Sequence, residues 1–233
     1  VEDLVENRIE ERLKLPYTLK ALRFRDSNLE IQGQMLFMAA HPTLLSASNL
    51  KISPDFPGVL CSLLEKKGGI TLFVNGAAAD LRPHWPSPAV PEDRLERYAK
   101  ALQEKIEGLN FSSISLEGPW SSFLEKIRLP RIRIRAAFIR IPSLVGNRIF
   151  PRSTQFQTFR MGTLHLTAFP GELSSEIGQE LESQILARGM IPFLIGYAND
   201  YIGYVIPKRH YLKRSHYESQ VSFYGPAMDW FVQ

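Results

Sequence analysis

Residues 163–195 read TLHLTAFPGELSSEIGQELESQILARGMIPFLI, and this stretch decides the fold. The apolar run Thr163–Phe169 predicts a buried strand, which the Pro-Gly turn after it ends. A helix is expected over Leu173–Ala187, and a second buried strand over Ile191–Ile195. This succession of strand, helix and strand predicts an α/β fold in which helices flank a layered mixed sheet.

The same alternation occurs earlier in the chain. A short apolar run, Met35–Ala40, predicts a buried strand. Apolar residues at helical spacing predict a helix over Pro54–Lys67, which two glycines end. A further strand is expected over Ile70–Val74, and a second helix over Glu92–Glu107. Polar residues cluster where these strands end, so strand ends are the expected place for the chemistry.

Two charged stretches give further expectations. The opening run Val1–Leu15 is helical in character, and Pro16 would end that helix. The pattern has period two over Pro130–Ile141, which predicts a strand with three arginines on one face. These arginines are Arg131, Arg133 and Arg135. An edge strand kept soluble by charge is the preferred interpretation, with nucleic-acid binding as the weaker one.

Composition restricts the class of protein. The chain has 233 residues, of which 44% are hydrophobic and 22% are charged, as in a soluble globular domain. It contains no run of 18 apolar residues, and Cys61 is its one cysteine, so an intrachain disulfide is excluded. The net charge of +4 is compatible with peripheral membrane contact, although a solvated basic face is the simpler interpretation. The compartment stays open, and neither export nor a membrane-peripheral location is excluded.

A histidine and a carboxylate each follow an expected strand. His41 comes directly after Met35–Ala40, and Glu172 follows Thr163–Phe169 across the Pro-Gly turn. Both residue types are ordinary zinc ligands. No short-range signature such as His-Glu-x-x-His accompanies them. A core histidine and a helix-capping glutamate are therefore the alternative.

Tyrosines are crowded between Gly196 and Tyr224, together with two histidines. Such a cluster is usually a packed stripe with polar handles. Phenols can also ligate a metal or donate to an oxyanion. Composition alone does not choose between the two interpretations.

Three segments in the same order resemble the neutral/alkaline ceramidase family. They read FMAAHPT at 37–43, FPGELS at 169–174 and GYANDYIGY at 196–204, followed by Tyr217-Glu218 and Tyr224-Gly225-Pro226. The resemblance implies that His41, Glu172 and Tyr204 bind Zn²⁺. It also implies that Tyr217 stabilises the oxyanion of a scissile amide. The expected substrate-binding residues are Asp80, Asn199 and Tyr201.

The chain departs from the family pattern at two places. The family has a further zinc ligand in an upstream His-x-His-Ser-Gly segment, which this sequence does not contain. Residues 1–233 are therefore expected to be one partial ceramidase-like domain without a C-terminal β-sandwich domain. Arg82 stands where the family's Gly-Asp-x-Ser-Pro turn has its catalytic serine. A guanidinium is not a nucleophile, but it can hold a negatively charged group of the substrate.

The resemblance thus predicts a zinc-dependent hydrolase of linear amides that cleaves an N-acyl bond in a small molecule or a lipid. The alternative is a catalytically inactive protein of the same fold that binds a lipid or another ligand. No nucleic-acid partner is expected.

Overall fold

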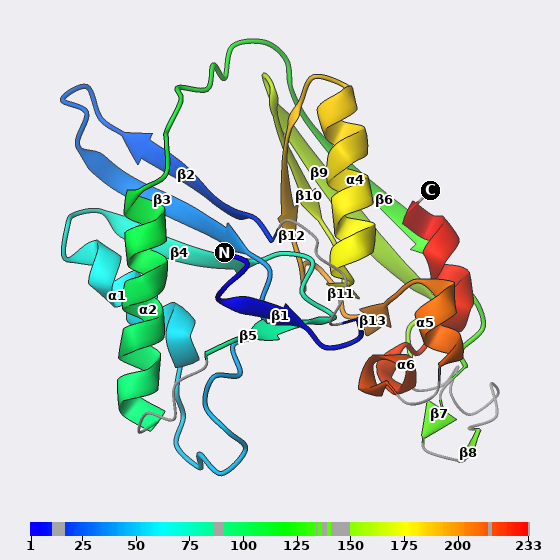
Figure 1. The fold of residues 1–233 in the computed structure, drawn as a ribbon. Coiled ribbons are helices and arrows are strands. Elements are labelled where there is room, and N and C mark those ends of the chain that lie inside the picture. The colour runs from blue at the N-terminus through cyan, green and yellow to red at the C-terminus, as the bar shows by residue number, and fades with distance from the viewer. Residues whose placement is uncertain are drawn as a thin grey trace. The chain divides into compact units, whose positions relative to one another are not determined.

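The structure is a computed structural model that describes residues 1–10, 17–85, 91–133, 135–136, 139–140, 150–213 and 216–232. The chain divides into two compact units (Figure 1). The first contains Val1–Asn75 and Leu81–Ser112, and the second contains Gly76–Asp80 and Ser113–Gln233. Each unit combines strands with helices, so the predicted α/β class is confirmed. The single partial domain over 1–233 stays a prediction.

The first unit is built on a three-stranded sheet in the order β2-β3-β4. Strand β3 (Ile31–Met38) lies in the middle, antiparallel to β2 (Leu19–Arg25) and parallel to β4 (Ile70–Asn75). The crossover between the two parallel strands contains helix α1 (Asp55–Glu65). The predicted strands at 35–40 and 70–74 and the helix at 54–67 are therefore confirmed, with shifted ends.

Two helices share the hydrophobic core of the first unit. Helix α2 (Pro91–Glu107) packs beside α1, and the aromatic rings of Phe56 and Tyr98 meet edge to face at 5.0 Å. Leu36 and Met38 of β3 belong to the same core. The Tyr98 hydroxyl is buried and donates to the carbonyl of Leu4 at 2.6 Å, which satisfies the one polar atom that this ring takes into the core.

The opening segment is a strand where a helix was expected, so that prediction is wrong for the part that the structure describes. Strand β1 (Val5–Asn7) pairs antiparallel with β5 (Leu81–Pro83). The side chain of Asn7 accepts hydrogen bonds from the backbone of Ile9 and Glu10, both at 2.9 Å, and so turns the chain after β1. Leu4 and Val5 are buried in the core. Tertiary burial thus overrides the local helical character; residues 11–15 of the run lie outside the described residues.

The second unit contains a four-stranded sheet in the order β12-β10-β9-β6. Strand β10 (Leu164–Ala168) pairs parallel with β12 (Ile191–Ile195) and antiparallel with β9 (Ser153–Met161). Strand β6 (Trp120–Arg128) completes the sheet beside β9. The predicted strands at 163–169 and 191–195 are confirmed as β10 and β12.

Helix α4 (Ser175–Ala187) connects β10 to β12 and confirms most of the helix expected at 173–187. Ser174 is its N-cap, and its hydroxyl accepts from the backbone of Ile177 at 3.5 Å. Gly178 lets the helix approach the 76–80 segment, because an added Cβ would lie 2.3 Å from the Cβ of Ala77. This contact packs the helix start tightly against the segment before Asp80.

The arginine-rich segment does not form the predicted continuous strand within its described part. Ile132 is buried, and the backbone of Arg133 donates to the carbonyl of Phe223 at 2.7 Å. Only short strands β7 (Arg135–Ala136) and β8 (Ile139–Arg140) pair there, and residues 134, 137–138 and 141 lie outside the described residues. The burial of Ile132 packs this segment against the core of the second unit. The alternation of apolar and charged residues therefore does not indicate a strand of a sheet here.

Short elements complete the second unit. They are β11 (Glu172–Leu173), β13 (Tyr204–Val205), α5 (Lys208–Leu212), α6 (Tyr217–Val221) and the 3₁₀ helix η1 (Gly225–Val232). Within the described ranges, the chain has no helix of sufficient length and hydrophobicity to cross a membrane.

Candidate functional site

The parallel strand pair β11–β13 brings two predicted zinc ligands together. Glu172 and Tyr204 are register partners, and the backbone of Glu172 donates to the carbonyl of Gly203 at 3.0 Å. Directly paired residues of neighbouring strands project to the same face of a sheet. Both side chains are buried, with 5% of Glu172 and 8% of Tyr204 exposed. The fold therefore sets a carboxylate and a phenol side by side in a protected position.

Further tyrosines surround this pair. The Tyr201 hydroxyl donates to Oε1 of Glu172 at 2.5 Å, and the rings of Tyr197 and Tyr201 stack with centroids 6.3 Å apart. Tyr217 meets the ring of Tyr204 edge to face at 6.1 Å. The tyrosine-rich composition is thus explained by a ring cluster around one carboxylate. We call Glu172 with Tyr197, Tyr201, Tyr204 and Tyr217 the tyrosine–glutamate cluster.

The carboxylate of Glu172 changes the acidity of its neighbours. The pKa of Tyr201 is raised by burial, and further by its hydrogen bond to Glu172 and the charge of that residue. The pKa of Tyr197 is raised by burial and by the negative charge of Glu172. Both phenols therefore keep their protons at neutral pH and act as hydrogen-bond donors. A phenol beside a buried carboxylate supplies part of the solvation that the charge loses on burial.

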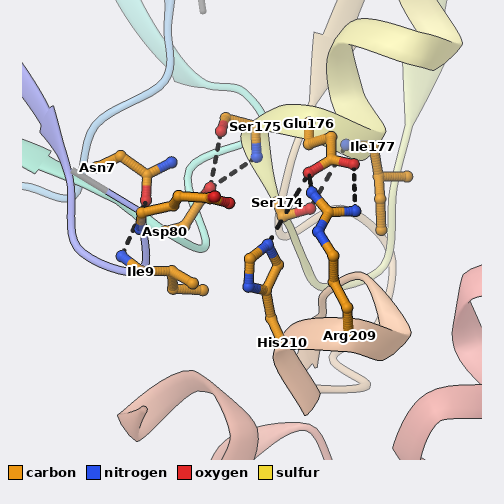
Figure 2. A network of polar contacts seen from close by, with 10 residues as sticks. Asn7, Ile9, Asp80, Ser174, Ser175, Glu176, Ile177, Arg209 and His210 are labelled. Atoms are coloured by element: carbon orange, nitrogen blue, oxygen red, sulfur yellow. Dashed lines mark hydrogen bonds and ion pairs between the residues drawn. The ribbon is translucent and has the colours of Figure 1, made fainter. Parts of the chain in front are cut away.

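Two predicted substrate-binding residues have structural partners in the second unit. Both carboxylate oxygens of Asp80 accept bonds from Ser175, one from its backbone and one from its hydroxyl, each at 2.7 Å. Figure 2 shows these contacts at the start of α4. Asn199 donates from its side chain to the Gln157 side chain at 3.1 Å. Asp80 thus anchors the helix that follows Glu172, and its role toward a substrate stays a prediction.

The other predicted site residues, His41 and Arg82, belong to the first unit. His41 follows β3, is 8% exposed, and donates from its backbone to the carbonyl of Leu81 at 3.2 Å. Arg82 lies on β5 opposite Glu6 of β1, and its Nε donates to Glu6 Oε1 at 2.5 Å. His84 Nδ1 lies 2.9 Å from the other oxygen of Glu6. The guanidinium at the family's serine position therefore has a cross-strand ion-pair partner.

One polar group near α4 was missed by sequence reasoning. Arg209 of α5 binds both carboxylate oxygens of Glu176, and Nε2 of His210 lies 4.0 Å from Glu176 Oε2 (Figure 2). A paired guanidinium and carboxylate add geometric specificity as well as attraction. This pair ties the first turn of α4 to α5. Charges that are 33 residues apart in sequence give no local signal, which is why the pairing was not predicted.

The tyrosine–glutamate cluster contains one ordinary type of zinc ligand, the carboxylate of Glu172. An ionised carboxylate has about four lone-pair sites, and one of them accepts from Tyr201. Among the described residues, no group of three or more His, Cys, Asp or Glu side chains is arranged to hold a metal ion. The cluster contributes one residue of those types, with phenols beside it. Glu172 and Tyr204 would supply oxygen donors to a metal, the nitrogen donor rests on the sequence motif of His41, and zinc binding by the three residues stays a prediction.

Solved structures identify the architecture. Over 99% of this chain, the structure superposes on 49% of a neutral ceramidase chain from Pseudomonas aeruginosa with a TM-score of 0.79 and 20% sequence identity. The fold is that of a neutral ceramidase. A structure of a ceramidase complexed with C2 matches the whole chain and 50% of its own chain, with a TM-score of 0.82 and 20% identity.

The neutral ceramidase likeness confirms, for the fold, the resemblance drawn from the three sequence segments. This chain spans about half the length of the two ceramidase chains that it matches. No protein-family model matches the sequence, and no curated protein matches it. The likeness to neutral ceramidase is therefore found by comparing three-dimensional structures, at a sequence identity of 20% at which the family models and the curated proteins give no match.

Proposed function

We propose that this protein is a ceramidase-like, zinc-dependent hydrolase of an N-acyl amide bond. One observation carries the proposal: in a neutral-ceramidase fold, strands β11 and β13 set Glu172 directly beside Tyr204, two of the three residues that the motifs select as ligands. His41 is proposed as the nitrogen ligand from its place in the His-Pro-Thr motif. When bound, zinc supplies a Lewis acid for the carbonyl and lowers the pKa of a water molecule.

The residues of the chain would divide the remaining work. Glu172 and Tyr204 hold the metal from the same strand pair. Tyr217 is the proposed donor to the oxyanion that develops when the amide carbonyl is attacked. Its side chain is 58% exposed and lies against the Tyr204 ring, so a substrate can reach it beside the proposed ligands. A preorganised donor of this kind typically contributes about 10²–10³ in kcat.

A substrate would reach the cluster past side chains that are partly exposed. Tyr197 and Tyr201 are 41% and 46% exposed, and each presents an aromatic face with a polar end. Such surfaces suit an acyl amide, which has apolar chains on both sides of a polar bond. We propose Asn199 as a contact for the polar part, and a lipid as the substrate class. Peripheral contact with a membrane would deliver that substrate.

The test is an assay of fatty-acid release from short-chain and long-chain N-acyl lipids in the presence of zinc. Wild-type protein should release fatty acid, and Tyr217→Phe should lower kcat by about 10²–10³ with little change in zinc content. Tyr224→Phe is the matched control, because this phenol donates to the carbonyl of Pro151 at 2.6 Å and lies outside the cluster. Zinc-loaded wild-type protein that hydrolyses no N-acyl compound would overturn the catalytic proposal.

A second candidate, a non-catalytic ligand-binding protein, is favoured by the environment of Arg82. Its guanidinium lies at the family's serine position and is paired with Glu6, so it provides neither a nucleophile nor an unengaged cation. In the hydrolase proposal, Arg82 would have to leave Glu6 to hold a negatively charged substrate group. Arg82→Ala tests the hydrolase proposal, because it should lower kcat/KM only if the guanidinium acts on the substrate; wild-type protein that binds an N-acyl lipid but releases no fatty acid from it would favour the second candidate.

A further inference from the structure

The Tyr201 hydroxyl donates a hydrogen bond to the side chain of Glu172, and that bond joins two separate parts of the second unit. The donor lies in the loop between β12 and β13, whereas the acceptor lies on β11. The bond is 2.5 Å long, and its acceptor is a carboxylate that is 5% exposed. Hydrogen bonds to an ionised acceptor are shorter and about twice as strong as neutral ones. This bond therefore restricts the rotation of the Glu172 side chain.

Backbone bonds fix where the Tyr201 loop lies. Three amides of residues 197–202 donate to three consecutive carbonyls before Glu172. These bonds run from Tyr197 to Gly171 at 3.1 Å, from Ala198 to Phe169 at 2.9 Å and from Ile202 to Pro170 at 2.8 Å. Backbone hydrogen bonds thus join the loop to the Pro-Gly-Glu turn on both sides of Tyr201. The phenol reaches the carboxylate from a support that does not depend on side-chain rotamers.

The loop also keeps an unfavourable backbone conformation at two positions. Tyr197 has φ 57° and Asn199 has φ 67°, both in the left-handed region that residues other than glycine rarely occupy. Strain of this kind persists only where surrounding structure imposes it, and it concentrates at functional sites. One visible result is the ring of Tyr197 lying at 4° to that of Tyr201. The strained turn therefore holds the second ring against the ring that binds Glu172.

Packing alone gives no reason for this arrangement. Tyr201 is 46% exposed, so its ring adds little to the buried core, and removing its hydroxyl leaves no enclosed cavity. The hydroxyl donates to Oε1 of Glu172. A partner of this kind is what orients a metal-binding carboxylate.

We propose that Tyr201 is a positioning residue whose hydroxyl holds Glu172 in the orientation in which it binds a divalent cation beside Tyr204. The proposal rests on the zinc site proposed above and changes the role of Tyr201 from substrate contact to support of a ligand. Tyr201 donates one hydrogen bond to Oε1 of a carboxylate that has about four lone-pair sites, and the cation would bind to the same carboxylate. Loss of this hydroxyl would leave the ligand present but less firmly oriented.

The experiment measures the zinc Kd of the protein by competition with a chromogenic chelator, for wild type, Tyr201→Phe and the matched control Tyr224→Phe. Each Phe variant removes one tyrosine hydroxyl. Glu172 loses a donor in the first variant, and the carbonyl of Pro151 loses its donor in the second. We expect Tyr201→Phe to raise the zinc Kd by about 10- to 100-fold, the usual effect of removing such a partner. Tyr224→Phe should leave the Kd within about twofold, taking that as the margin for a residue outside the ligand shell.

Thermal melts without and with zinc distinguish positioning from general stability. Removing a donor to a buried carboxylate should itself lower the metal-free midpoint, so a positioning role is shown by a smaller zinc-induced rise of the midpoint in Tyr201→Phe than in wild type. An unchanged Kd in Tyr201→Phe, with wild type binding zinc, overturns this inference and leaves the proposed function intact. Wild-type protein that binds no zinc overturns both, so the two failures are told apart by the wild-type measurement. Equal increases of the zinc Kd in both Phe variants would also overturn the proposed role of Tyr201.

Discussion

Replacing Gly171 by alanine tests how the Pro-Gly-Glu turn creates the site. A Cβ at this position would lie 2.6 Å from the carbonyl oxygen of Gly203 and 3.0 Å from Cγ1 of Ile202. Ordinary contact begins at 3.4 Å, so the backbone oxygen must yield by 3.4 − 2.6 = 0.8 Å. That oxygen accepts the hydrogen bond from Glu172 that starts the β11–β13 pair, at 3.0 Å. A shift of this size takes the bond beyond normal hydrogen-bond length.

The expected cost of Gly171→Ala follows from this overlap. Forcing an extra carbon into a well-packed position costs about 1–3 kcal/mol. For a chain of this size each kcal/mol lowers Tm by about 2–4 °C, so a loss of about 2–12 °C is expected. Because Glu172 and Tyr204 lose their register, the zinc Kd should rise by at least about tenfold, as when a ligand's support is removed.

Calorimetry and chelator competition measure the two effects of Gly171→Ala. Gly108→Ala is the control, because its Cβ would meet nothing closer than Glu104 O at 3.5 Å. Alanine there should leave stability equal or raise it by about 0.4–1 kcal/mol. A Gly171→Ala variant with the Tm and zinc Kd of wild type would show that the β11–β13 pair accommodates a Cβ beside the carbonyl oxygen of Gly203, contrary to this expectation.

Three further substitutions test separate parts of the structure. The pKa of His165 is lowered by burial and by the charges of two nearby arginines, so the unfolded chain takes up a proton first as the pH falls below 6.5. Stability should therefore fall on acidification from that pH, and less so in His165→Gln; parallel urea midpoints between pH 8 and 5 would contradict this. Tyr98→Phe removes one of two donors to the carbonyl of Leu4, which keeps the backbone amide of His84 at 2.9 Å, and should cost about 0.5–1.5 kcal/mol in urea unfolding, whereas no loss would show that the bond is dispensable. Because Asn199 has φ 67°, Asn199→Ala should be less stable than Asn199→Gly by about 1 kcal/mol, and the reverse order would argue against strain there.

The sequence predicted those elements that have a strong local signal. The apolar strand at 191–195 and the helix that begins after Glu172 have the expected period and clear ends, and both are present. Period two near Arg131 was misleading, because Ile132 is buried by docking onto the second unit and not by pairing in a sheet. The strand at Val5–Asn7 was missed since its partner, Leu81–Pro83, lies far away in the sequence. Long-range pairing decides such short strands, and local propensity does not contain it.

The candidate site shows the same difference between what a local sequence signal predicts and what long-range contacts decide. Glu172 and Tyr204 were selected through motifs, and their register pairing in β11–β13 is a tertiary fact that no spacing contains. The motif also selected Tyr201 as a substrate contact, and in the structure its hydroxyl donates to Glu172. Asp80 was selected for the same role and is bonded to Ser175 through both oxygens. Motifs thus selected the residues of the cluster, whereas only the structure shows which of them contact one another, and their roles toward a metal or a substrate stay predictions.

Metal analysis of purified wild-type protein and Glu172→Gln tests the central claim most directly. Glutamine keeps the size of the side chain but removes the charge that zinc binds, so the comparison isolates the carboxylate. We expect about one zinc per wild-type chain, as a single site requires, and its loss in Glu172→Gln at an unchanged fold by circular dichroism. Equal zinc content in the two proteins, or a zinc-reconstituted wild type that retains none after dialysis, would contradict a metal site on β11 and β13.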